Sequence, residues 1–205
     1  MSEKVFTLLG SSNHYGDRQP EDFYSTPYIA TEKLLSKLKE LNIKLADNII
    51  EPSVGKGGIA IPLMNSEEGK NKNYLFFDIV DRGFPNTIIK DFLSVNNLSE
   101  GNHMIFANFP YKDILNHTIH SLSLLKNEEW LFSLAKIQFL ETKKRYNDLL
   151  KDNPPRYVMV FVERVNCPKN DEDNGQSSAI CYCWYAFQKG YKGNPEVLWL
   201  EGPNK

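Results

Sequence analysis

Four short segments carry polar residues directly after an apolar run. They are Glu51-Pro-Ser-Val-Gly-Lys-Gly57, Asp78, Asp91-Phe-Leu93 and Asn108-Phe-Pro-Tyr111. Glycines in the first segment let the backbone turn sharply and let a ligand approach closely, and an acid at a strand end can hold an ammonium group or a ribose hydroxyl. The spacing fits neither a dinucleotide fingerprint nor a phosphate loop.

Asn108-Phe-Pro-Tyr111 contains the residue types that methylation of an exocyclic amine requires. Such an amine is a poor nucleophile because its lone pair is delocalised into the ring. The Asn108 side-chain oxygen and the Phe109 carbonyl can accept hydrogen bonds from its two N–H groups and make it more nucleophilic. Pro110 stiffens the turn, and Tyr111 can stack on a target base.

The two aspartates fit an adenosine. The Asp78 carboxylate can accept both ribose hydroxyls, and the Asp91 carboxylate can accept from an adenine amino group beside Phe92. Each segment by itself also fits an ordinary turn. The four segments in this order favour a functional site.

The elements that position these segments alternate between strands and helices. Residues 26–41 have a helical apolar stripe, which Thr26 can cap, with Pro27 in the first turn. Short strands precede each polar segment, and residues 139–151 predict a basic amphipathic helix. The runs 157–165 and 179–188 predict two final strands joined by a polar loop.

This alternation predicts a Rossmann-like α/β three-layer sandwich with a mostly parallel sheet of seven strands and an antiparallel edge hairpin. Ligands of such sheets bind at the carboxyl ends of the strands, where the four polar segments fall. The 205 residues predict a single domain, in which residues 1–20 form a mobile arm.

The ordered series, with Asp22-Phe-Tyr-Ser-Thr-Pro27 ahead of it, resembles the motif series of class I S-adenosylmethionine-dependent methyltransferases. The block before the glycine loop is similar to that of adenine-specific (N6) DNA methyltransferases of phages and prophages. The resemblance implies S-adenosylmethionine as cofactor and methyl transfer to N6 of adenine in DNA.

The resemblance also implies a role for each matching residue. Those at the methionine end of the cofactor would be Tyr24, Thr26, Pro27, Glu51, Ser53, Gly55 and Gly57. Asp78 would bind the ribose, with Ile79 against the adenine, which Asp91 and Phe92 would hold. Residues 108–111 would receive the target amine.

Two departures from the family pattern leave alternatives open. Phe109 stands where adenine-DNA enzymes usually carry a first proline, and Asn-aliphatic-Pro-Tyr/Phe is typical of rRNA dimethyladenosine transferases. RNA adenine and a protein amide therefore remain alternative substrates, and a non-catalytic S-adenosylmethionine-binding module or an unrelated nucleotide-binding enzyme remain rivals. Only one helix separates the fourth and fifth strands, so we expect no separate target-recognition domain and a protein partner that supplies specificity.

Composition limits the remaining function classes. A net charge of −2 excludes binding by bulk phosphate attraction, so nucleic-acid contact needs a local patch such as Lys143-Lys-Arg145, which also fits a solvated helix face. The three cysteines form neither a disulfide framework nor a zinc motif, and no metal is expected. No secretion signal or membrane-spanning run is found in the sequence, which predicts a cytoplasmic protein without a membrane partner.

Overall fold

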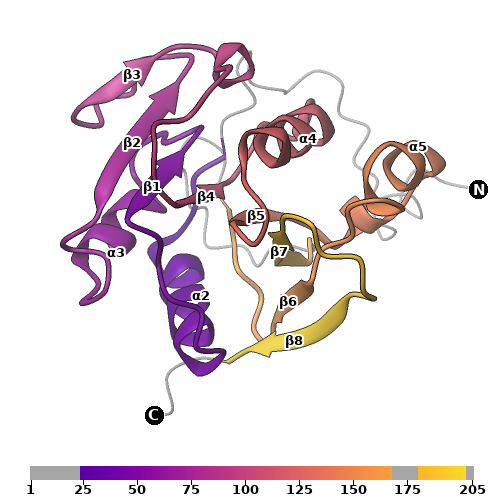
Figure 1. Cartoon of the computed structure of the whole chain (residues 1–205). Coiled ribbons are helices and arrows are strands. Elements are labelled where there is room, and N and C mark those ends of the chain that lie inside the picture. The colour runs from indigo at the N-terminus through magenta and orange to yellow at the C-terminus, as the bar shows by residue number, and fades with distance from the viewer. Residues whose placement is uncertain (1–23, 168–179, 202–205) are drawn as a thin grey trace, which may run out of the picture.

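The computed structural model describes residues 24–167 and 180–201 (Figure 1). The expected arm at residues 1–20, Asp22 and Phe23 of the first block, and most of the polar loop after Cys167 lie outside the described residues.

One mixed sheet forms the centre of the described chain, in the strand order β3-β2-β1-β4-β5-β7-β6-β8. Its strands are β1 (Asn48–Glu51), β2 (Asn73–Asp78), β3 (Thr87–Ile89), β4 (His103–Ala107), β5 (Trp130–Lys136), β6 (Tyr157–Phe161), β7 (Tyr182–Gln188) and β8 (Glu196–Leu200). β7 pairs antiparallel with both β5 and β6, and every other neighbouring pair is parallel. The chain reverses between β4 and β1, which is a switch point where ligands of such sheets bind.

The mostly parallel sheet and the antiparallel pairing of the last two predicted strands are confirmed, but the predicted number of seven strands is wrong. β8 pairs in parallel with β6 and adds an eighth strand outside the predicted hairpin. Its side chains are mostly exposed and only Leu200 is fully buried, so it lacks the clear apolar alternation of a half-buried strand.

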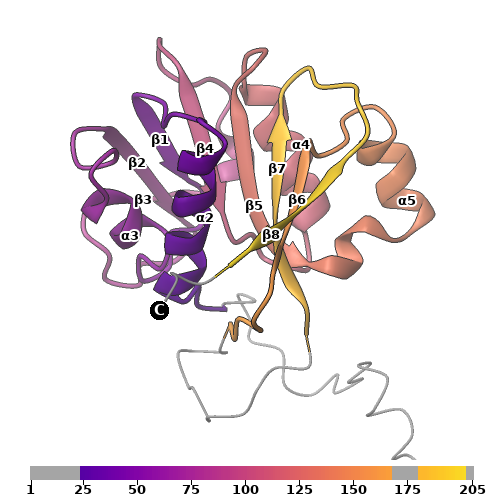
Figure 2. The ribbon, with the colours of Figure 1, turned by 90° about the horizontal axis from the view of Figure 1, so that it is seen from below.

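Helices cover both faces of the sheet, as Figure 1 shows. They are α2 (Tyr28–Glu40), α3 (Ala60–Asn65), α4 (Ile114–Leu124) and α5 (Lys143–Arg145), with the 3-10 turns η1 (Phe92–Ser94) and η2 (Ile137–Leu140) and the π-helical turn η3 (Tyr146–Leu150). α2 lies beside β8 (Figure 2). No helix in the described parts of the chain is long and apolar enough to cross a membrane.

Strand alternation divides the core into two apolar layers. On β4, Met104 and Phe106 face the layer that contains Leu34 of α2, whereas Ile105 faces the layer that contains Ile114 of α4. This period of two fixes the register, because a slip by one residue would turn every apolar side chain to the wrong face.

Two predicted helix features are wrong. Pro27, not Thr26, is the N-cap of α2, with no side-chain capping bond, because the Thr26 hydroxyl accepts a hydrogen bond from Asn108 instead. Residues 139–151 do not form one helix. Thr142 takes a φ of 86°, in the left-handed region, and separates η2 from α5.

Candidate functional site

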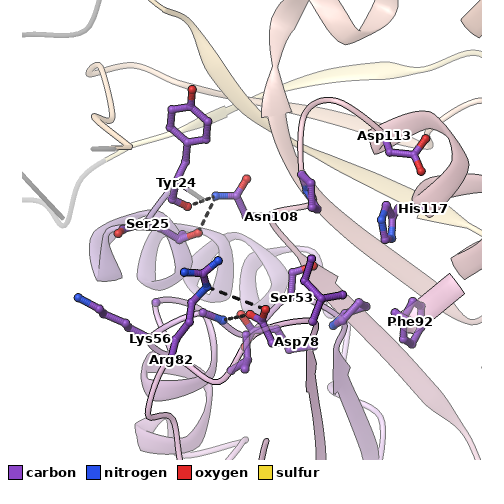
Figure 3. A pocket seen from close by; sticks show the side chains of 18 of the residues that line it. Tyr24, Ser25, Ser53, Lys56, Asp78, Arg82, Phe92, Asn108, Asp113 and His117 are labelled. Atoms are coloured by element: carbon purple, nitrogen blue, oxygen red, sulfur yellow. Dashed lines mark hydrogen bonds and ion pairs between the residues drawn. The ribbon is translucent and has the colours of Figure 1, made fainter. Parts of the chain in front are cut away.

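A cavity of about 590 Å³ opens at the carboxyl ends of β1, β2 and β4 (Figure 3). This volume lies in the range of small-molecule sites. The predicted site residues that line it are Tyr24, Thr26, Pro27, Glu51, Ser53, Gly55, Asp78, Ile79, Asp91, Phe92, Asn108 and Pro110. The roles given to them in cofactor or target binding stay predictions.

Glu51 ends β1 and is only 2% exposed. Its Oε2 has no hydrogen-bond partner among the described residues. Burial raises the pKa of the Glu51 carboxyl well above its ordinary value; the N–H of Ala60 opposes this rise, and the charge of Asp78 adds to it. A buried carboxylate with a free oxygen is costly, so a cation in the cavity would stabilise it.

The glycine loop after β1 needs its glycines for two different reasons. Gly57 has a φ of 85° and packs against Phe84, so it does not line the cavity. Gly58 approaches the backbone of Thr26 so closely that an added Cβ would lie 2.2 Å from the Thr26 carbonyl oxygen. The loop and the Tyr24–Pro27 segment therefore fit together only without a side chain at Gly58.

Asp78, at the end of β2, holds the same loop. Its Oδ2 accepts from the N–H of Gly55 at 2.9 Å, its Oδ1 accepts from the N–H of Val80 at 3.1 Å, and Arg82 Nε lies 3.9 Å from Oδ1. Because each carboxylate oxygen can accept more than one hydrogen bond, the two oxygens keep capacity for ribose hydroxyls.

Asp91 and Phe92 form the wall after β3. Asp91 Oδ1 accepts from the N–H of Leu93 at 2.9 Å and caps η1, while the rest of this exposed carboxylate remains available. Phe92 is 1% exposed and packs edge-to-face on Phe77, with ring centroids 5.4 Å apart. The Asp91 cap fixes the turn η1, and this turn places Phe92 in the cavity wall.

Asn108 lies where β4 ends, and its side-chain amide is held in one orientation. Nδ2 donates to the Tyr24 carbonyl at 3.0 Å and to the Thr26 hydroxyl at 3.1 Å. A carbonyl oxygen only accepts, so it must face the amide nitrogen. Oδ1 is left buried without a partner in the described chain. This is the hydrogen-bond acceptor that the sequence interpretation placed here.

Two members of the predicted catalytic segment do not line the cavity. Phe109 is 1% exposed and stacks on His117, with centroids 5.2 Å apart, so its side chain belongs to the core. Tyr111 packs against Tyr24 at 5.0 Å and Tyr182 at 6.2 Å. Stacking of Tyr111 on a target base stays a prediction, and it requires these rings to separate.

Several lining residues were missed by the sequence interpretation: Ser25, Lys56, Arg82, Lys112, Asp113 and His117. Asp113 and His117 lie at the start of α4, directly after the Asn108 segment. The first turn of a helix that follows a parallel strand faces the ligand edge of the sheet, so their spacing of four residues was a usable signal. Burial lowers the pKa of His117, although the charges of Asp113 and Asp91 oppose this effect.

No family model and no curated protein matches this sequence. Solved structures share its fold. A Listeria monocytogenes protein assigned to the class I S-adenosylmethionine-dependent methyltransferases has a TM-score of 0.62 at 14% identity, over 97% of this chain and 71% of that one. A Pyrococcus horikoshii protein assigned as an RNA methyltransferase has a TM-score of 0.58 at 13% identity, over 91% of this chain and 96% of that one.

The M protein of the type I restriction enzyme EcoKI matches with a TM-score of 0.58 at 13% identity, over 98% of this chain. The chain spans about half of that protein, 52% of its length. These likenesses show the class I methyltransferase fold. Among residues 24–167 and 180–201, no group of three or more His, Cys, Asp or Glu side chains could hold a metal ion.

Proposed function

We propose that this chain is an S-adenosylmethionine-dependent methyltransferase that acts on an exocyclic amine, N6 of adenine in nucleic acid, with DNA favoured over RNA. One observation carries the proposal. Asn108 is anchored through its nitrogen to Tyr24 and Thr26, which leaves Oδ1 as a buried acceptor without a partner beside the cavity. A buried acceptor without a partner is costly, and a donor N–H from the substrate would satisfy it.

The residues around the cavity fit the cofactor group by group. The free oxygen of buried Glu51 suits the cofactor ammonium, Asp78 suits the ribose hydroxyls, and Asp91 with Phe92 suits an adenine. The bound cofactor supplies a sulfonium methyl group, which is electrophilic enough to be transferred directly. The class I methyltransferase fold supports this assignment.

The chain's contribution to transfer is orientation and electrostatics. Asn108 Oδ1 accepts one N–H of the amine, and the Phe109 carbonyl accepts the other, so the nitrogen lone pair turns toward the methyl group. The bound cofactor would supply the methyl group to this nitrogen, and the proton displaced from the amine would leave to solvent. No strong general base is needed for this step.

Phe109 is compatible with a catalytic protein. Its side chain fills the core against His117, so it does not obstruct the cavity, and any residue at this position supplies the backbone carbonyl. DNA is favoured because restriction-modification subunits share the fold, and RNA remains the alternative because an RNA methyltransferase also shares it. Only α4 lies between β4 and β5, so no recognition module is inserted there, and the proposal includes a partner that provides specificity.

The test is transfer of labelled methyl groups onto adenine-containing DNA and RNA by the wild type and by Asn108→Ala. We expect wild-type transfer and a loss of at least about 100-fold in the variant, the size expected for a lost transition-state hydrogen bond. S-Adenosylhomocysteine should still bind to the variant, because Glu51, Asp78 and Asp91 are unchanged. Asn97→Ala, at an exposed position, is the matched control. Cofactor binding without transfer to any substrate would instead indicate a non-catalytic module.

A further inference from the structure

His117 is a buried histidine in the cavity that neither the motif series nor the proposed transfer step uses. It lies on the first turns of α4 and is 9% exposed. Its ring stacks on Phe109 with centroids 5.2 Å apart and an interplanar angle of 21°, which fixes the plane of the imidazole. A rigid, buried polar ring in a ligand cavity is suited to recognition.

The surroundings of His117 determine which nitrogen can reach a ligand. Nδ1 is buried and has no hydrogen-bond partner among the described residues. His117 nevertheless lines the cavity with another part of its side chain. Nε2 is therefore the nitrogen available to a ligand. A buried donor without an acceptor is rarer in proteins than a buried acceptor without a donor, which favours the tautomer with the proton on Nε2.

Burial, and not the charges near the ring, keeps the imidazole of His117 neutral. Asp113, Asp91 and His120 act on it, but burial is the largest effect and lowers the pKa of His117 below its ordinary 6.5. At neutral pH the imidazole thus presents one N–H donor to the cavity. Phe92 lies on the same side of the cavity as His117 (Figure 3), and Asp91, whose charge acts on the His117 ring, presents an acceptor next to this Phe92 wall.

We propose that His117 is a specificity-determining residue for the adenine of the cofactor, with its Nε2–H donating to a ring nitrogen of the base. Adenine offers a donor amino group to Asp91 and an acceptor nitrogen to His117. A 6-oxo purine would instead place a carbonyl oxygen against the Asp91 carboxylate. This inference rests on the proposed function, since it identifies the residue that selects the cofactor base.

Calorimetric titration with S-adenosylhomocysteine and its 1-deaza, 3-deaza and 7-deaza analogues tests the inference. We expect His117→Phe, which keeps the stack on Phe109, to bind S-adenosylhomocysteine about 5-fold more weakly, the size of one neutral hydrogen bond. With the wild type, one of the three analogues should bind about 5-fold more weakly than S-adenosylhomocysteine. With His117→Phe, that analogue and S-adenosylhomocysteine should bind equally. Ser123→Ala is the control, because Ser123 is an exposed residue of α4 that does not line the cavity.

The outcomes separate the two proposals. If folded His117→Phe binds S-adenosylhomocysteine as tightly as the wild type, or if each analogue loses the same factor with both proteins, His117 does not read the base. If the wild type binds no S-adenosylhomocysteine, the proposed function itself fails. If His117→Phe does not fold, the wild type alone still provides a test. Equal affinity of the wild type for S-adenosylhomocysteine and for all three analogues would overturn the inference.

Discussion

At the scale of single residues, the site keeps two acceptors in costly states. Glu51 Oε2 and Asn108 Oδ1 are both buried without partners in the described chain. Polar atoms of this kind lower the free energy of unfolding, and functional sites are where folds tolerate them. The two atoms serve different parts of the proposed reaction, because Glu51 ends β1 just before the glycine loop, whereas Asn108 is anchored to the Tyr24–Thr26 segment.

Glu51→Gln, which removes the ionisable carboxyl group, should raise the free energy of unfolding at pH 7 by about 1–3 kcal/mol, because a buried charge is costly, while weakening cofactor binding. Because the pKa of Glu51 is raised, the folded state keeps a proton at pH values above 4.5, where the unfolded state has released it. Wild-type stability should thus fall as pH rises from 4.5 through the folded pKa, relative to the variant. Urea unfolding at pH 5 and pH 7 measures this. A folded variant that is less stable than the wild type at pH 7 would contradict it.

At the scale of elements, the site depends on contacts between segments that are distant in the sequence. The Tyr24–Pro27 segment precedes α2, and the glycine loop precedes α3. The two segments can approach each other closely because Gly58 has no side chain. Thr31 of α2 also donates to the Gly58 carbonyl at 3.3 Å. Asn108 is thus positioned through an element that is 82 residues away in sequence.

Gly58→Ala should push the Thr26 backbone away and loosen the anchor of Asn108. We expect methyl transfer to fall by about 10- to 100-fold, since small displacements of an orienting group are costly. Gly193→Ala is the control for the loss of a glycine, because Gly193 is exposed, does not line the cavity, and the atoms nearest to an added Cβ there belong to the Tyr191 side chain. Equal activities for the two folded variants would show that the close approach at Gly58 does not position Asn108.

β8 lies at the edge of the sheet opposite β3, and Leu200 is its one fully buried residue. Leu200 is fully buried in the layer that contains α2, whereas Val197 is 58% exposed. Leu200→Ala should therefore lower the free energy of unfolding by about 2–4 kcal/mol, and Val197→Ala by less than about 0.5 kcal/mol. Denaturant unfolding compares the two. Equal losses would mean that β8 is not fixed to the core by Leu200.

At the scale of the whole molecule, the sheet gathers chain segments from widely separated parts of the sequence around one cavity. Trp184 Nε1 of β7 donates to the Ala30 carbonyl of α2 at 2.9 Å across a separation of 154 residues. This bond fixes α2, and with it the segment that anchors Asn108, to the centre of the sheet. Ligand binding at the cavity should consequently stabilise the whole domain.

S-Adenosylhomocysteine at about 100 times its Kd should add about 2.7 kcal/mol to the free energy of unfolding and raise Tm by about 5–10 °C. Asp78→Asn, which keeps one carbonyl acceptor but loses the charge, should show a smaller rise at the same concentration. Differential scanning calorimetry measures both. A wild-type Tm that does not move at any concentration would contradict the cofactor assignment.

The sequence by itself determined where seven of the eight strands fall along the chain and which polar residues follow them, because both depend on local patterns. Apolar runs of period two and the glycines after β1 are properties of neighbouring residues, which is why Glu51, Asp78 and Asn108 could be named in advance. The same local reasoning predicted one helix over residues 139–151, where the backbone at Thr142 interrupts it.

Only the tertiary structure decided which of these side chains line the same cavity. Phe109 and Tyr111 are adjacent to Asn108 in sequence, yet packing turns one into the core and the other against Tyr24, whereas His117 enters the cavity from the next helix. The orientation of the Asn108 amide likewise depends on a carbonyl that is 84 residues away. Side-chain direction at the ends of elements depends on long-range packing, and local pattern does not encode it.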